Sequence, residues 1–313
     1  MQPRKTIWSG AVVFLSLWCV CMAQQEPAGP APQSDKLDAF EEVLRQHPKD
    51  EMARHGEVTE AIEEALTARR KANNDLALAF LLRANYWVHD DAELLTDIGI
   101  QEESMTLNLD ADAALTRARE LRPRDPRILY AIARNKIELN QVQASEQAWK
   151  DYLAMRQNDA SAHYGYGLLL EMMQRNEEAR NEFKKSIALS PNQAESYYRL
   201  GEIARNTGQG VQAEQFYKQA LEHDSAHAGA WAGLGMIAYN ASHYDEAEQD
   251  LEKAIEHSQN LQIAHYYYGL ALAKLGRKEE STMELETAAR LADAENARRQ
   301  KTKRLAAQPY QPQ

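Results

Sequence analysis

A period of 34 residues runs through most of this chain and constrains what it can fold into. A small residue recurs at this spacing, at Ala65, Gly99, Ala133, Gly167, Gly201, Gly235 and Gly269. A second small residue follows twelve residues later and a large apolar one four residues after that, so both lie on one face of a helix. The large apolar residues are Leu81, Leu115, Trp149, Phe183, Tyr217, Leu251 and Leu285. Internal repeats of this length predict stacked helical units.

The stretch from Trp231 to Ala254 shows the pattern most completely. It reads Trp-Ala-Gly-Leu-Gly-Met-Ile-Ala-Tyr, then Tyr244-Asp-Glu-Ala247 and Leu251, and prolines such as Pro191 close other units. This pattern resembles the tetratricopeptide repeat (TPR), a helix-turn-helix unit of about 34 residues. The resemblance implies an all-α fold, a right-handed superhelical solenoid of about seven repeats over residues 58–291. Because each repeat of a solenoid contacts only its neighbours, we predict one solenoid domain.

The N-terminal segment has a different character. Arg4 and Lys5 precede an apolar stretch over residues 7–20, and Cys21-Met22-Ala23 supplies a small-x-small ending. We therefore predict a signal peptide over residues 1–23 and a periplasmic or secreted protein that makes no membrane contact after cleavage. An uncleaved anchor is the alternative, although the apolar stretch is shorter than the about 20 residues that span a bilayer.

Three further segments are predicted around the repeats. Residues 24–36 contain too little apolar surface to fold and form a disordered proline-rich linker. Residues 37–57 form an N-terminal capping helix, and residues 292–313 form a basic C-terminal capping helix and tail. A basic patch for lipid or nucleic acid is the alternative for the last segment. The formal net charge of the chain is −11, which disfavours nucleic acid as a partner.

The sequence lacks the common signatures of catalysis. It contains no Gly-rich phosphate loop, no Gly-x-Ser-x-Gly motif and no His-Glu-x-x-His motif. His163 and His265 occupy the position that holds Tyr197 and Trp231 in sister repeats, so we interpret them as packing residues. We predict that the protein is not an enzyme and holds no metal or cofactor.

The remaining candidate site is the surface of the first helices, which in the TPR family line the concave groove where ligand peptides usually lie. The predicted partner-binding residues are Arg127, Tyr130, Arg134, Tyr164, Leu168, Tyr198, Arg205 and Tyr266. The tyrosines stand three residues before the small residue of their repeats and offer contact area at low rotamer entropy, while arginine offers a planar fork to carboxylates. We predict a protein or peptide partner with an acidic or C-terminal carboxylate group. Tyrosine is common at this position in TPR sequences, so a role in packing is the competing interpretation.

The sequence is compatible with two functions. The first is a non-enzymatic interaction scaffold of the cell envelope that binds its partner in the groove. The second is a structural or assembly factor of a pilus, secretion or envelope complex that acts through self-association as a homo-oligomer. The fold alone does not identify the partner.

Overall fold

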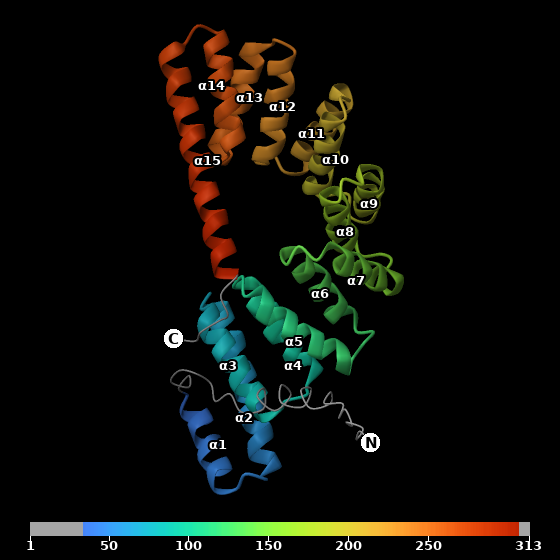
Figure 1. The fold of residues 1–313 in the computed structure, drawn as a ribbon, viewed down its shortest axis with the longest axis vertical. Helices are drawn as coiled ribbons and strands as arrows, with labels where there is room; N and C mark the ends of the chain where they lie inside the picture. The colour runs from blue at the N-terminus through green and yellow to red at the C-terminus, as the bar shows by residue number, and fades with distance from the viewer. Residues whose placement is uncertain (1–33, 307–313) are drawn as a thin grey trace, which may run out of the picture. The chain divides into compact units, whose positions relative to one another are not determined.

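The computed structural model describes residues 34–306, with side chains described up to residue 300. The predicted signal peptide, most of the predicted linker and the C-terminal tail lie outside the described residues. Within residues 34–306 the chain forms fifteen helices and no strand (Figure 1), which confirms the all-α prediction. It divides into two compact units, up to Met105 and from Thr106 onward, and the division falls inside the second predicted repeat.

Unit 1 contains α1 (Asp35–Gln46), α2 (Glu51–Arg70), α3 (Asn74–Trp87) and α4 (Ala92–Ser104). The predicted capping segment 37–57 thus comprises most of α1 and the start of α2. Helix α1 packs on α2 through Leu37 and Leu44, which are almost completely buried. The ring of Phe40 fits against Gly56, where a Cβ would lie 2.5 Å from Phe40 Cε1. Helix α1 therefore covers one side of the α2–α3 pair.

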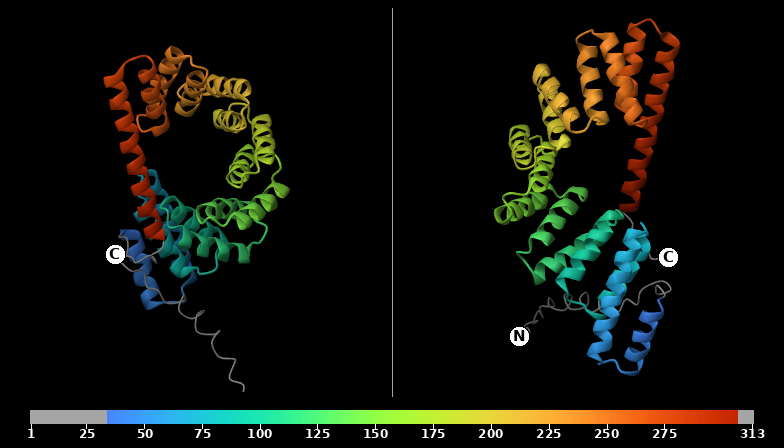
Figure 2. Two further views of the ribbon diagram at one scale, coloured as in Figure 1. Left: turned by 45° about the horizontal axis from the view of Figure 1, so that its top comes forward. Right: turned by 180° about the vertical axis from the view of Figure 1, so that it is seen from behind.

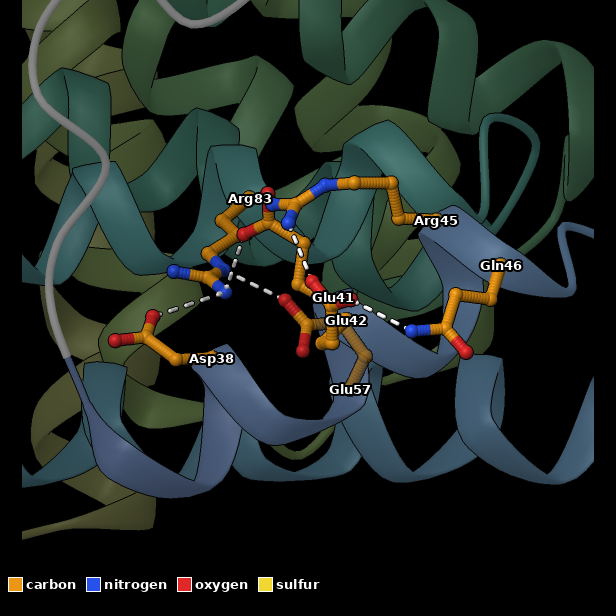
Figure 3. A network of polar contacts seen from close by, with 7 residues as sticks. All are labelled: Asp38, Glu41, Glu42, Arg45, Gln46, Glu57 and Arg83. Atoms are coloured by element: carbon orange, nitrogen blue, oxygen red, sulfur yellow. Dashed lines mark hydrogen bonds and ion pairs between the residues drawn. The ribbon is translucent and has the colours of Figure 1, made fainter.

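A buried arginine ties the three N-terminal helices together (Figure 3). Arg83 of α3 donates from Nε to Glu57 Oε1 at 2.6 Å and from Nη2 to Glu41 Oε2 at 3.1 Å. Glu57 lies on α2 and is fully buried, whereas Glu41 lies on α1. One guanidinium thus links α1 and α2 to α3.

Unit 2 continues the repeats in helix-turn-helix pairs. Its helices are α5 (Asn108–Leu121), α6 (Pro126–Glu138), α7 (Val142–Met155), α8 (Ala160–Met172), α9 (Asn176–Leu189), α10 (Ala194–Asn206), α11 (Gly210–His223), α12 (Ala228–Asn240), α13 (Tyr244–His257), α14 (Gln262–Lys274) and α15 (Lys278–Ala306). Each pair from α6–α7 to α14–α15 packs side by side, as Figure 2 shows from two directions. Trp149, Phe183, Tyr217 and Leu251 fill the interior from the second helices, as the sequence predicts.

The turn after each first helix is made by a residue with positive φ. These residues recur every 34 positions, at Ala72, Thr106, Asn140, Gln174, Gly208, Ser242 and Gly276. The next N–H closes the end of the helix: Gln141 donates to Lys136 O at 2.8 Å and Arg175 to Leu170 O at 2.9 Å. Only two of the seven are glycine, so the usual composition signal for such a turn is missing from most repeats.

The recurring glycines are points of close helix approach, as predicted. A Cβ on Gly201 would lie 2.5 Å from the Tyr217 ring, and one on Gly235 would lie 2.5 Å from Leu251 Cγ. Two further glycines, which we did not predict, serve the next contact along the stack. Gly165 faces Trp149 and Gly233 faces Tyr217, both from the preceding pair. Tyr217 is thus enclosed between Gly201 of α10 and Gly233 of α12.

Replacing Gly235 with leucine should therefore destabilise unit 2 by about 1–3 kcal/mol, because the new side chain overlaps Leu251. Gly210 is a matched control, since no atom lies within 4 Å of a Cβ built there. Denaturant unfolding measures the cost, and hydrogen exchange should rise most in α12, α13 and their neighbours. Equal stability of the Gly235→Leu and Gly210→Leu proteins would contradict the packing argument.

The C-terminal segment differs from the prediction. We expected a separate capping helix from residue 292, but α15 runs without a break through 29 residues, Lys278–Ala306. The physical reason is the absence of glycine and proline over this range, where alanine, glutamate, arginine and lysine favour helix throughout. Residues 293–300 are exposed. Among the described helices, none is both long and apolar enough to cross a bilayer.

Candidate partner-binding surface

We call the exposed and half-buried side chains of α6, α8, α10, α12 and α14 the first-helix surface of unit 2. The predicted site residues lie on four of these helices: Arg127, Tyr130 and Arg134 on α6, Tyr164 and Leu168 on α8, Tyr198 and Arg205 on α10, and Tyr266 on α14. The first seven lie on three successive first helices, and Tyr266 lies two first helices further along. Arg127 and Arg134 are exposed, and Leu168 is half-buried.

Three of the four predicted tyrosines, Tyr130, Tyr164 and Tyr198, are half-buried. Only Tyr266 is exposed, at 42% of its surface. Tyr130 meets the Trp149 ring edge-on at 5.1 Å between centroids, Tyr164 lies 5.8 Å from Phe183, and Tyr198 lies 6.1 Å from Tyr217. These three rings cover the large residues of the second helices, as the packing interpretation expects, whereas Tyr266 is the predicted tyrosine that stays exposed.

Tyr198 is the most enclosed tyrosine of the row. Its ring lies 4.7 Å from the His227 ring, and a Cβ on Gly229 would come within 3.0 Å of it. Burial is the main cause that raises the pKa of Tyr198 to about 12, and the charge of Glu202 adds to it. The hydroxyl therefore stays protonated throughout the physiological range.

The arginines of α10 already have acidic partners. Arg205 donates from Nη2 to Glu202 Oε2 at 2.9 Å, and Glu202 also accepts the Tyr217 hydroxyl at 2.5 Å. Arg199 pairs with Glu195 at 3.2 Å and lies 5.4 Å from the Tyr198 ring centroid. This arrangement does not support the predicted preference for an acidic partner at Arg205, because its guanidinium already donates to the carboxylate of Glu202.

His227 forms a second contact with Glu195, besides that of Arg199. Its Nδ1 accepts the N–H of Ala230 at 3.1 Å and so caps α12. Its Nε2 lies 3.0 Å from Glu195 Oε2, and because Nδ1 is an acceptor, Nε2 is the nitrogen that donates. This hydrogen bond is the largest cause of the lowered pKa of Glu195.

Sequence reasoning did not predict Arg199, Tyr239 and Tyr267 of this surface, nor Tyr244 beside it at the start of α13. The rings of Tyr239 and Tyr267 are 5.6 Å apart, and Tyr239 also lies 5.7 Å from Tyr244. Tyr267 continues to Tyr266 at 5.5 Å. Aligning the first helices by the 34-residue period would have found Tyr239 and Tyr267, because they occupy the repeat positions that hold Glu171 and Arg199 two repeats earlier.

A longer repeat of 102 residues lies over the 34-residue period. Ala162-His-Tyr-Gly-Tyr-Gly-Leu168 returns as Ala264-His-Tyr-Tyr-Tyr-Gly-Leu270. Both histidines are buried, which agrees with their interpretation as packing residues. His163 Nδ1 lies 2.6 Å from Glu182 and its Nε2 2.9 Å from Gln157 O, and His265 makes the same contacts with Glu284 and Gln259. Each histidine thus ties its first helix to its second helix and to the preceding turn.

An arginine that links two successive helix pairs also recurs at the 102-residue spacing. Arg175 donates to Glu146 of the preceding pair at 2.7 Å and to Glu178 of its own second helix at 2.7 Å. Hydrogen bonds from Lys150 and from Arg175 lower the pKa of Glu146 to about 2. Arg277 joins Glu248 and Glu280 in the same way. No group of His, Cys, Asp and Glu side chains within the described part could hold a metal ion.

Comparison with known families agrees with this repeat structure. Two family models described as tetratricopeptide repeat match the chain, one over residues 170–237 and the other over residues 130–194 and again over residues 232–297. Together these matches cover more than half of the chain. The chain belongs to the tetratricopeptide repeat family. The second TPR model matches twice at an offset of 102 residues, the spacing of the histidine contacts. No curated protein matches the chain.

Solved structures share the TPR fold. A tetratricopeptide repeat protein from Parabacteroides merdae superposes with a TM-score of 0.62 at 17% identity, over 75% of this chain and 93% of that one. PilF of Pseudomonas aeruginosa superposes with a TM-score of 0.59 at 16% identity, over 71% of this chain and 99% of PilF. PilW, a type IV pilus biogenesis factor, superposes with a TM-score of 0.55 at 16% identity, over 62% of this chain and 90% of PilW. At these identities the similarity establishes the fold alone, which is typical of non-enzymatic interaction scaffolds.

Proposed function

We propose that this chain is a non-enzymatic scaffold that binds a protein partner on the first-helix surface of unit 2. The observation that carries the proposal is the run of tyrosines on α12, the start of α13 and α14, formed by Tyr239, Tyr244, Tyr266 and Tyr267. None of the four hydroxyls has a hydrogen-bond partner within residues 34–300, and Tyr266 is exposed. Clustered tyrosines with an apolar body and a free polar tip are typical of residues that dominate protein interfaces.

We also propose that the protein acts outside the cytoplasm. The support is the charged start, short apolar stretch and small-x-small ending of residues 1–23, from which the mature chain would begin at Gln24. The alternative function is an assembly factor that self-associates within an envelope complex. The fold that this chain shares with PilW, a pilus biogenesis factor, is compatible with that alternative. A stable homo-oligomer of the purified protein would support it, and a monomer that gains a partner would support the scaffold.

Replacing Tyr266 with alanine tests the proposal. Because this ring is exposed, the free energy of unfolding should change by less than about 0.5 kcal/mol. Capture of the partner from envelope extract should weaken about tenfold, equivalent to about 1.4 kcal/mol. Tyr198→Ala should instead lower stability, since Tyr198 packs on Tyr217 and His227.

Val211 provides the control for a generic loss of exposed apolar surface, because it is 75% exposed on α11, a second helix. Val211→Ala should leave capture unchanged. If Tyr266→Ala folds normally and captures the partner as well as the unchanged protein does, the first-helix surface is not the binding site.

A further inference from the structure

Two equivalent pairs of positions on successive first helices differ in chemistry. The first position lies four residues after the small residue of one repeat, and the second lies two residues before the small residue of the next. From α12 to α14 these positions hold Tyr239 and Tyr267, whose rings pack 5.6 Å apart. From α8 to α10 they hold Glu171 and Arg199. The same surface is therefore aromatic at α12–α14 and ionic at α8–α10.

The ionic part carries one carboxylate more than its arginines neutralise. Arg199 pairs with Glu195, and Arg205 pairs with Glu202. Glu171 is half-buried and has no hydrogen-bond or ion-pair partner in the described part of the chain. Burial raises the pKa of Glu171, with the charges of Glu202 and Glu195 acting in the same direction and Arg199 against it. A cation placed beside Glu171 would relieve this cost.

The aromatic part carries almost no charge. Beside the tyrosines, the first helix α14 presents Ile263 and Leu270, both half-buried. The first charged side chain along α14 is Lys274 in its last turn. This end of the surface suits apolar or aromatic side chains of a partner.

From these two observations we propose that the partner segment is cationic and apolar: it places apolar side chains on the tyrosines of α12–α14 and a lysine or arginine beside Glu171 at α8–α10. The inference rests on the proposed function and replaces the acidic partner expected from the sequence. Charge complementarity supports it, since Glu171 is the carboxylate of α8 and α10 for which no ion pair is found among the described residues, and the chain as a whole carries −11.

Synthetic peptides of about twelve residues test this chemistry with the full chain. One set joins an apolar half, varied over Leu, Phe and Pro, to a half that carries lysines, and a matched set replaces each lysine with glutamate. Fluorescence anisotropy should show that the best lysine peptide binds at least about tenfold more tightly than its glutamate counterpart, with the difference shrinking as salt rises. Equal or tighter binding of the glutamate set, or no lysine peptide with a Kd below about 1 mM, would overturn the proposal.

Two variants of equal charge separate the site from the general acidity of the chain. Glu171→Gln should weaken the lysine peptide about fivefold and leave the glutamate peptide unaffected. Glu222, exposed on the second helix α11 and without an ion-pair partner among the described residues, gives the control Glu222→Gln, which should change neither peptide. Equal effects of the two variants would show attraction to net charge only and would contradict the proposal. Circular dichroism verifies that both variants fold.

The outcomes distinguish the two proposals. If Tyr266→Ala weakens capture of the native partner but the peptides show no preference for lysine, the first-helix surface binds a partner of different chemistry, and only the present inference fails. If Tyr266→Ala leaves capture unchanged, the proposed function itself fails.

Discussion

Replacing Arg83 with methionine should destabilise unit 1 by about 3–5 kcal/mol, the range expected when one partner of a buried ion pair is removed. Glu57 is fully buried, and Arg83 is its hydrogen-bond donor at 2.6 Å (Figure 3). Glu57 Oε2 has no hydrogen-bond partner within the described chain, so Arg83 is the main compensation for this carboxylate. Denaturant unfolding should show the loss, and hydrogen exchange should place it in α1, α2 and α3.

The loss should depend on pH. Burial raises the pKa of Glu57, and the hydrogen bond from Arg83 opposes that rise. A carboxyl with a raised folded-state pKa contributes stability that is present below its unfolded pKa and is lost as pH rises through the folded one. Without Arg83 the pKa should rise further. The deficit of Arg83→Met should therefore be largest near neutral pH and shrink as the solution is acidified toward the ordinary range of glutamate.

The double variant Arg83→Met with Glu57→Gln is the control, because it removes both charges of the buried pair. It should recover most of the stability at neutral pH, since a neutral amide costs less to bury than an unpaired carboxylate. A double variant as unstable as Arg83→Met would show that the guanidinium stabilises unit 1 by packing rather than by neutralising Glu57.

Replacing Tyr217 with alanine should cost unit 2 about 3–5 kcal/mol, as for other large buried aromatics. The ring is completely buried between Gly201 of α10 and Gly233 of α12. Neither glycine has a side chain that could fill the space, so truncation leaves a cavity between two successive repeats. Thermal or denaturant unfolding of the whole chain measures the cost.

Tyr217→Phe separates the ring from the hydroxyl. It keeps the packing and removes the hydrogen bond to Glu202, so it should cost about 1.5–3 kcal/mol, the range for a hydrogen bond to a charged group. If phenylalanine and alanine destabilise the protein equally, the hydroxyl rather than the ring accounts for the stability at this position.

The period of the sequence predicted the fold because one residue type repeats for one physical reason. Gly167, Gly201, Gly235 and Gly269 each admit a large side chain from their own second helix, and that contact recurs in every such pair. The glycines at 165 and 233 escaped prediction because they depend on the neighbouring repeat, where Trp149 and Tyr217 are the largest residues of their row. Contacts inside a repeat are visible in one period, whereas contacts between repeats require two.

The candidate site was harder to predict than the fold. The tyrosine row is regular in sequence, yet Gly229 and His227 enclose Tyr198, whereas Tyr266 stays exposed on the first helix of the last described pair. Arg205 appeared suited to an acidic partner because a sequence does not show that Glu202 already pairs with it. Ion pairing depends on side-chain geometry, so residue type and spacing did not reveal the unpaired charge at Glu171.

The central claim is that a partner binds on the first helices of unit 2. Its most direct measurement is site-specific photocrosslinking in cells, with a photoreactive amino acid in place of Tyr266 on α14 or, as the control, in place of Glu222 on α11; both positions are exposed. The claim predicts one discrete crosslinked protein from position 266 and none from position 222, with the position-266 product lost on adding Tyr239→Ala. A discrete product from position 222 without one from position 266 would contradict it.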